Sequence, residues 1–216
     1  MATTTAIKRL SLFCILAGAA LLGAVQPVRA QSITTERVGI EETEAGNIVA
    51  DAARAAGNAA IGFVPAAAFK PGASTAKPAG AAQIIGLVEP ADDAVVVMSL
   101  RGAKVLEALE QSVSFHPQKS SGFLQVSGIR FRFDAGRPRG KRVTSVTVGG
   151  APLEAAASYN VAMTRPLAGG QQGYFQIWER GNAARDTGKT LADAIRERAG
   201  SGKLSAPPEG RITSGG

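Results

Sequence analysis

The chain of 216 residues contains 24 basic and 17 acidic residues, one histidine and one cysteine, and carries a formal charge of +7 at pH 7. This basic excess favours anionic partners without establishing one. The single histidine, His116, excludes the usual zinc and two-metal phosphoesterase centres, because these draw on several imidazoles together with carboxylates.

Residues 1–30 have the pattern of an export signal. Two basic residues at 8–9 precede an apolar, uncharged run at 10–25, and small residues at the end of the segment 28–30 match the spacing that a signal peptidase accepts. We therefore expect cleavage after Ala30 and a periplasmic or secreted mature protein. The apolar run is too short for a comfortable membrane-spanning helix, so no membrane span is expected after cleavage.

Residues 31–216, 186 in number, are enough for one domain with a core of its own. Removal of Lys8, Arg9 and Arg29 leaves 21 basic against 17 acidic residues, a smaller positive excess. Cys14 is removed as well, so the mature chain cannot hold a thiolate metal site or a cysteine nucleophile. We expect it to hold no metal and no cofactor.

The first elements alternate between helix and strand. Apolar residues at three-to-four spacing predict a helix over 43–57, which begins at an N-cap threonine and stops at a glycine. A short buried strand is expected at 59–64, followed by a long loop rich in Ala, Pro and Gly at 65–81. The almost wholly apolar run 94–100 predicts a strand covered on both faces, and 101–113 predicts a helix directly after it.

The second half of the chain is richer in strands, which are expected at 122–133, 142–148, 158–164 and 174–178. Gly149 and Gly150 indicate a tight hairpin turn. A helix should begin at Thr190 with a capping-box-like partner at Asp193, and residues 213–216 should be frayed. Together these elements predict a single-domain α+β protein with a mixed β-sheet and covering helices.

The most basic region is the predicted hairpin of 122–133 and 142–148, whose cationic residues are Arg130, Arg132, Arg137, Arg139, Lys141 and Arg142. It could attract an anionic ligand, or it could be a solvated edge that discourages strand aggregation. Phe131 and Phe133 alternate with the arginines and so lie on the opposite face, which argues against a nucleic-acid surface. His116 should be solvated or should cap the helix before it.

Four segments recur in an order and spacing that belong to one family. They are ETEAGNIVADA at 42–52, PADDAVVVMSLRGAKVLEALEQSVS at 90–114, SGFLQVSGIRFRFD with RVTSVTVGGAPLEAAASYNVAMT at 121–164, and PPEGRI at 207–212. In these segments the chain resembles the C-terminal domain of the 5'-nucleotidase and UDP-sugar hydrolase family. The resemblance implies that fold and a role in nucleotide catabolism.

Complete members of that family have an N-terminal metallophosphatase domain with two metals, and their C-terminal domain grips the nucleotide. We expect this chain to lack the catalytic half. By resemblance, Lys70 stands at the position of a substrate-binding arginine, Asp93 at an asparagine and Gln172 at a ribose-binding aspartate. The two aromatic residues that stack on the base are replaced by Ala91 and Leu167.

The candidate substrate-binding residues are therefore Lys70, Asp93, Gly122, Arg165 and Gln172. Lys70 or Arg165 would bind the anion, Gln172 a sugar hydroxyl, and Gly122 would allow close approach. Loss of both stacking rings weakens the case, because each is worth about 1–3 kcal/mol.

Three alternatives follow from these residues. The chain is an exported module that binds a nucleotide or related phosphate ester, with a separately encoded metallophosphatase as a partner. Alternatively, it is a degenerate domain that serves as a protein-interaction or structural module. Autonomous hydrolysis is the third alternative, so the sequence leaves enzymatic activity undecided.

Overall fold

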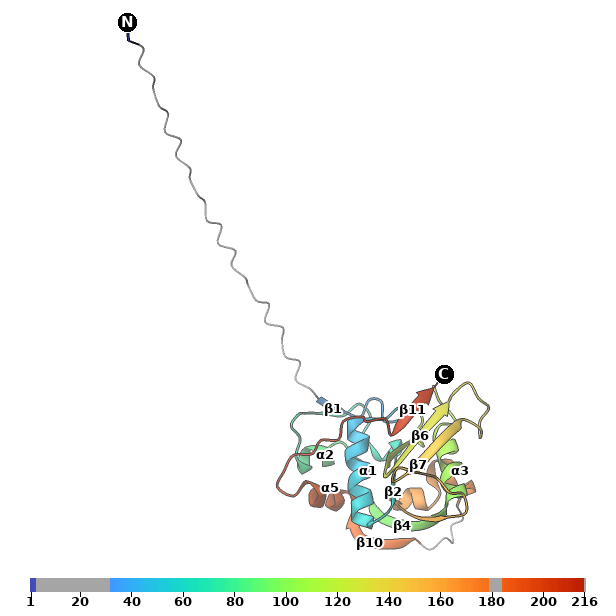
Figure 1. The fold of residues 1–216 in the computed structure, drawn as a ribbon. Helices are drawn as coiled ribbons and strands as arrows, with labels where there is room; N and C mark the ends of the chain where they lie inside the picture. Colours follow the sequence, from blue (N-terminus) through green and yellow to red (C-terminus); the bar gives the residue numbers. More distant parts are fainter. Residues whose placement is uncertain (3–31, 179–183, 216) are drawn as a thin grey trace.

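The computed structural model describes residues 1–2, 32–178 and 184–215 (Figure 1). The export signal expected at 1–30 and its cleavage point lie outside these ranges except for residues 1–2. The described helices are α1 (Glu44–Gly57), α2 (Ala81–Ile85), α3 (Gly102–Ser112), α4 (Arg165–Ala168) and α5 (Leu191–Ala199), with 3-10 helices η1 (Ala66–Ala68) and η2 (Gln171–Gln176). None of these helices is long and apolar enough to cross a membrane.

The strands form mixed sheets. They are β1 (Ser32–Thr34), β2 (Ile61–Pro65), β3 (Ser74–Ala76), β4 (Ala94–Arg101), β5 (Leu124–Ser127), β6 (Ile129–Asp134), β7 (Val143–Val148), β8 (Ala151–Pro152), β9 (Ser158–Thr164), β10 (Arg185–Thr190) and β11 (Ile212–Gly215). One sheet has the order β10-β4-β9-β2-β5 and a second the order β11-β6-β7-β8, while β1 pairs with β3. The pairs β2–β9 and β6–β11 are parallel and the others antiparallel, which confirms the predicted α+β class with mixed strands.

Helix α1 forms where the sequence predicts it and lies across β2, β5 and β9 of the five-stranded sheet. The Thr43 hydroxyl accepts a hydrogen bond from the Gly46 N–H at 3.0 Å, as an N-cap should. Small residues let the helix lie close to the sheet: a Cβ at Gly46 would come within 1.9 Å of Gln125 Oε1. Buried Gln125 on β5 in turn accepts from the Thr43 N–H at 3.1 Å, so strand and helix start are fastened together.

The predicted strand over 122–133 is two strands in two different sheets. Gly128 separates β5 from β6 and has a φ of +72°, which only glycine adopts readily. A Cβ at Gly128 would lie 2.1 Å from the Ala60 carbonyl oxygen, so the chain bends sharply against β2. The alternation predicted for β6 is confirmed, with Ile129, Phe131 and Phe133 buried and both arginines exposed.

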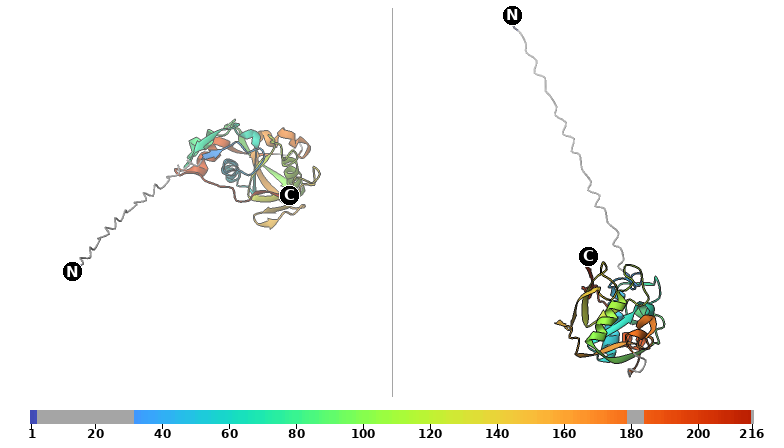
Figure 2. Two further views of the ribbon diagram at one scale, coloured as in Figure 1. Left: turned by 90° about the horizontal axis from the view of Figure 1, so that it is seen from above. Right: turned by 90° about the vertical axis from the view of Figure 1, so that its right-hand side faces the viewer.

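The C-terminal segment is held in place rather than frayed. Strand β11 pairs with β6 in parallel register, Ile212 opposite Phe131. Buried Glu42, just before α1, accepts hydrogen bonds from the N–H groups of Glu209 at 2.9 Å and Arg211 at 2.7 Å. The prediction of a frayed end is wrong for the described residues 213–215, because these residues pair with β6. The carboxylate of Glu42, which is distant in sequence, holds the segment that leads into β11. Figure 2 shows the C-terminus beside the strands of this sheet.

Residues 174–178 do not form the expected strand. Gly170, Gln172 and Gly173 have positive φ, which breaks extended structure, and residues 171–176 form the kinked η2 instead. Tyr174 and Trp178, four residues apart, then stack at a ring distance of 5.0 Å in the core.

The expected loop 65–81 also differs, since it contains β3 and the first residue of α2. By contrast, the hairpin turn at 149–150 and the Thr190–Asp193 capping box are confirmed.

One cationic residue of the basic hairpin, Arg142, is bound to the end of α3, whereas Arg132 and Lys141 are exposed. Arg142 donates to the carbonyl oxygens of Val113, Ser114 and His116 at 2.6–3.0 Å and so satisfies the end of α3. His116 itself packs edge-on to Phe133 at 4.9 Å instead of capping the helix. Burial, followed by repulsion from Arg142, lowers the pKa of His116.

Candidate functional site

A cleft of about 270 Å³ opens where three loops meet at one edge of the five-stranded sheet. The loops follow β2, precede β4 and follow β9, so the cleft collects residues that are far apart in the sequence. The residues that line it are Pro65, Ala67, Ala68, Pro90, Asp93, Thr164, Pro166, Leu167, Gln171 and Gln172. Two of the five predicted binding residues, Asp93 and Gln172, therefore share one cavity.

Asp93 lies in the loop before β4 and is half-buried. Its carbonyl oxygen accepts from the Leu191 N–H at 2.8 Å, which fixes the backbone at the start of α5. Within the described part of the chain, no donor is hydrogen-bonded to its carboxylate. Burial and, secondarily, the neighbouring Asp92 raise the pKa of Asp93. A half-buried carboxylate without a protein partner is suited to accept hydrogen bonds from hydroxyl or amino groups of a ligand.

Gln172 lines the same cleft in a backbone conformation rare for a residue with a side chain. Its φ is +59° between Gly170 and Gly173, which are also left-handed. Its Oε1 accepts a hydrogen bond from the Ser121 hydroxyl at 2.5 Å. A strained backbone that persists at a cavity wall is a recognised mark of functional sites. The amide group of Gln172 remains available to the cleft, since no described residue accepts from it.

A wider, shallower hollow of about 670 Å³ adjoins the cleft and shares Pro90, Asp93 and Pro166 with it. Arg165 lines this hollow, so a third predicted residue borders the cleft without entering it. Its guanidinium forms an ion pair with Asp186 on β10, and both side chains are more than half exposed. Such a pair contributes little to stability and can exchange partners.

Lys70 and Gly122 do not line the cleft. The Lys70 backbone is fixed by hydrogen bonds, with its N–H donating to the Leu87 carbonyl at 2.9 Å and its carbonyl accepting from Thr35. Gly122 is buried and permits close approach, but of another protein segment: a Cβ there would lie 3.0 Å from the Gln172 carbonyl oxygen. The Tyr174 hydroxyl donates to the Gly122 carbonyl at 2.8 Å, and burial raises the pKa of Tyr174.

The two positions assigned to stacking rings differ in accessibility. Ala91 is half-buried beside the cleft, and its carbonyl accepts from the Ala192 N–H at 2.8 Å. Leu167 is fully buried and its carbonyl accepts from the Trp178 indole at 3.0 Å. The described aromatic residues Tyr174 and Trp178 stack on each other in the core, so neither offers a free ring face to the cleft.

No signal in the sequence pointed to Ser121, Gln171 or Asp186, which respectively orient Gln172, line the cleft and pair with Arg165. Their roles depend on three-dimensional proximity alone. Among the residues that the structure describes, no group of three or more His, Cys, Asp or Glu side chains could hold a metal ion.

The fold and the loop cleft define a mixed-sheet α+β domain that opens at one sheet edge. Comparison with known proteins places this architecture. Residues 22–180 match the family model "5'-nucleotidase, C-terminal domain". The chain belongs to this family. The match contains three of the four segments that suggested the resemblance, while 207–212 lies beyond it.

Two curated relatives agree with this assignment. A snake venom 5'-nucleotidase of Naja atra is 30% identical over 54% of this chain, and the cell wall protein Lmo0130 of Listeria monocytogenes is 31% identical over 79% of it. The chain spans about a quarter of each relative's length, 23% in both cases.

Among solved structures, a 5'-nucleotidase precursor of Thermus thermophilus is 28% identical and matches 86% of this chain with a TM-score of 0.72, over 38% of its own chain. The NAD nucleotidase of Haemophilus influenzae, at 18% identity and a TM-score of 0.64, covers 81% of this chain and 34% of its own. At that identity the second likeness concerns the fold alone.

Proposed function

We propose that the protein is an exported module that binds a nucleotide or a related phosphate ester through the cleft at Asp93 and Gln172. The carrying observation is that the fold brings these two side chains, 79 positions apart, to one cavity and leaves the Asp93 carboxylate without a hydrogen-bond donor among the described residues. Export is supported by the leader pattern at 1–30 and by two relatives, one a cell wall protein and the other a 5'-nucleotidase precursor.

The geometry favours recognition of the sugar and base over the phosphate. Asp93 and Gln172 supply acceptors and an amide that suit ribose hydroxyls or exocyclic amino groups. The lining of the cleft contains no cationic residue, and the neighbouring Arg165 already faces Asp186. A phosphate would reach Arg165 only by displacing that ion pair. The nucleoside part is therefore expected to contribute most of the affinity.

Isothermal titration of the purified chain with adenosine, AMP and UDP-glucose at constant ionic strength tests the proposal. We expect saturable binding, with AMP gaining less than about tenfold over adenosine. Gln172→Ala and Asp93→Asn should each weaken binding by about tenfold, as expected for loss of one hydrogen bond in a partly buried site. Gln118→Ala, an exposed glutamine outside the cleft, is the matched control and should leave binding unchanged.

Absence of any heat up to millimolar ligand would remove this proposal. Equal weakening by Gln118→Ala and Gln172→Ala would show that the effect does not arise in the cleft.

An interaction module is the second candidate, and a different surface favours it. Leu106 and Phe115 are 38% and 44% exposed and border a shallow hollow of about 590 Å³ beside α3. Arg139 from the basic hairpin lies 4.8 Å from the Phe115 ring centre. Contiguous exposed apolar side chains mark protein contact surfaces. Leu106→Ser should then abolish co-purification of a metallophosphatase from the native host without changing nucleotide titration.

A further inference from the structure

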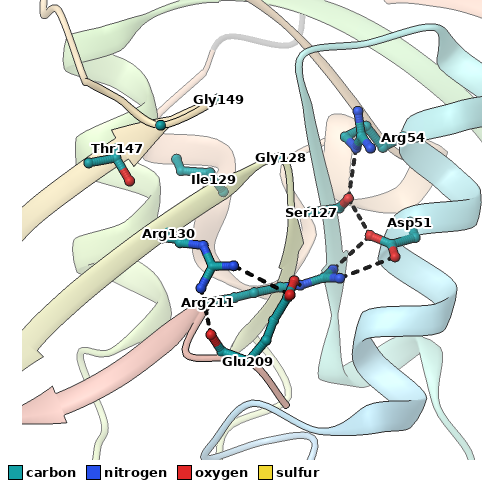
Figure 3. Close-up of a pocket in the computed structure, with 11 residues that line it drawn as sticks. Asp51, Arg54, Ser127, Gly128, Ile129, Arg130, Thr147, Gly149, Glu209 and Arg211 are labelled. Atoms are coloured by element: carbon teal, nitrogen blue, oxygen red, sulfur yellow. Dashed lines mark hydrogen bonds and ion pairs between the residues drawn. The ribbon is translucent and has the colours of Figure 1, made fainter. Parts of the chain in front are cut away.

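A second pocket, of about 300 Å³, lies where the two larger sheets meet and shares no lining residue with the cleft (Figure 3). Helix α1 forms one side, the bend at Gly128 the back, and the β7–β8 turn at Gly149 and Gly150 part of the rim. The side chains that line it include three arginines and two carboxylates: Arg54, Arg130, Arg211, Asp51 and Glu209.

The carboxylate of Asp51 is fully used by the protein. Arg211 donates to it through both terminal nitrogens at 2.7 and 3.2 Å, and the Ser127 hydroxyl donates at 2.5 Å. Arg198 adds a weaker contact at 3.3 Å. This carboxylate therefore neutralises Arg211 and has little left for Arg54.

Arg54 is held in a fixed direction with much of its hydrogen-bonding capacity unused. Its side chain runs along backbone made accessible by two glycines: a Cβ at Gly62 would lie 2.9 Å from Arg54 Cβ, and a Cβ at Gly128 2.9 Å from Arg54 Cδ. Its Nε donates to the Ser127 hydroxyl at 2.8 Å. No described residue accepts from its two terminal nitrogens. A guanidinium fixed in this way loses little freedom when it binds a ligand.

Arg130 approaches the same pocket from β6, and Figure 3 shows it across the pocket from Arg54. Its described partners belong to Glu209 alone, the carbonyl at 2.5 Å and the carboxylate at 3.4 Å. Glu209 also pairs with Arg211 at 2.8 Å, so one half-exposed carboxylate serves two arginines. The pocket has three cationic and two anionic side chains, and the exposed pair with Glu209 is weak.

We propose that this pocket binds a small tetrahedral oxyanion, a phosphate or sulfate group, between Arg54 and Arg130. Guanidinium groups from opposite walls can each donate two hydrogen bonds to separate oxygen atoms of such a group. The anion supplies the negative charge that the lining lacks. The group is either a free inorganic ion or the phosphate of a larger metabolite, since the pocket has room beyond the anion itself. This site is independent of the function proposed for the cleft.

Amide NMR titration of the full chain with inorganic phosphate, sulfate and ribose 5-phosphate, against sodium chloride at equal ionic strength, tests the site. We expect saturable shifts of the Gly128, Gly149 and Gly150 amides with phosphate and sulfate. Arg54→Gln should raise the dissociation constant by about tenfold or more, because a charged donor is lost. Arg132→Gln is the matched control: it removes the same charge from the same exposed face of β6, outside the pocket, and should change the constant less than about twofold.

Arg130→Gln is the second test variant, because Arg54 packs against the bend and its replacement could disturb folding. It should weaken binding several-fold in a folded protein. Tighter binding of ribose 5-phosphate than of phosphate assigns the site to a phosphate ester, and equal binding assigns it to the free ion. Non-saturating shifts, or equal losses in the Arg130 and Arg132 variants, overturn the proposal, since sulfate and phosphate act on any protein surface by exclusion.

Discussion

Asp51 and Asp93 line two different cavities of this domain, and their carboxylates have different surroundings. Asp51 lies against Arg211 and Ser127 and accepts hydrogen bonds on both oxygens. Asp93 lies in the cleft without a described donor. Burial acts on both, but in Asp51 the hydrogen bonds from Arg211 and Ser127 and the charges of Arg211 and Arg198 outweigh it and lower the pKa. In Asp93 burial and, secondarily, the charge of Asp92 act in the same direction, so the pKa is raised.

This difference separates a carboxylate that holds the fold from one that is free to meet a ligand. The Asp51 network links α1, β5 and the segment before β11, so it is part of the architecture. Asp93 is held through its backbone, whose carbonyl accepts from the Leu191 N–H and whose N–H donates to the Pro90 carbonyl at 3.5 Å, and its side chain makes no described hydrogen bond that stabilises the fold. Replacing Asp51 by Asn should therefore lower the stability of the fold, whereas the same replacement at Asp93 should weaken ligand binding and leave stability nearly unchanged.

The largest effect is expected from Asp51→Asn. It removes the buried ion partner of Arg211, whose side chain is only 10% exposed, and leaves only the half-exposed Glu209 among the described partners, which should lower the free energy of unfolding by about 3–5 kcal/mol. Urea unfolding followed by circular dichroism measures this. Asp93→Asn makes the same chemical change in the cleft and should stay within about 0.5 kcal/mol of the native chain. Similar losses in both variants would contradict the division between the two hollows.

A smaller effect is expected at Gln172, where the cleft stores backbone strain. Gln172→Gly and Gln172→Ala both remove the bond to Ser121, but only glycine relieves the positive φ of 59°. The glycine variant should therefore be more stable than the alanine variant by about 1 kcal/mol. Thermal unfolding of the two proteins side by side gives the difference. Equal midpoints would mean that the left-handed conformation is not retained in the alanine variant.

The smallest effect is a pair of opposite pH dependences. Because the pKa of Asp51 is lower in the folded state, its stabilisation is present above the unfolded value of about 3.9 and is lost as pH falls through the folded pKa. The pKa of Asp93 is higher when folded, so its penalty appears as pH rises from about 3.9 through the folded pKa. The free energy of unfolding should be measured across this acidic range for both variants. The Asp51→Asn protein should no longer lose stability as pH falls, and the Asp93→Asn protein should no longer lose stability as pH rises.

The sequence was sufficient for elements whose signals are local. The N-cap at Thr43, the capping box at Thr190 and Asp193, and the alternation over 129–133 depend on neighbouring residues and appear as predicted. The segments behind the family resemblance also have physical roles. Residues of 42–52 bind those of 207–212, through Glu42 and Asp51 to Arg211, so much of their shared pattern serves the fold.

The misses arise from long-range contacts. A glycine within a strand pattern can mark a bend, but the Ala60 carbonyl that forces the change of sheet at Gly128 is distant in sequence. In the same way, the pairing of Arg165 with Asp186 and the position of Lys70 outside the cleft depend on how loops meet. The aligned residues therefore predicted correctly that the chain belongs to the family, but they predicted less well which side chains line the cleft.

The fastening of Glu42 and Asp51 to Arg211 also bears on how the chain reaches its native state. These hydrogen bonds join residues 160–169 positions apart. Contacts of such separation form late, because the entropy of closing the loop must be overcome first. Until residue 211 has emerged from the ribosome, a nascent chain lacks the partner that neutralises Asp51. These two contacts, which join the first helix and the segment before it to the start of the last strand, are therefore missing during most of the synthesis of the chain.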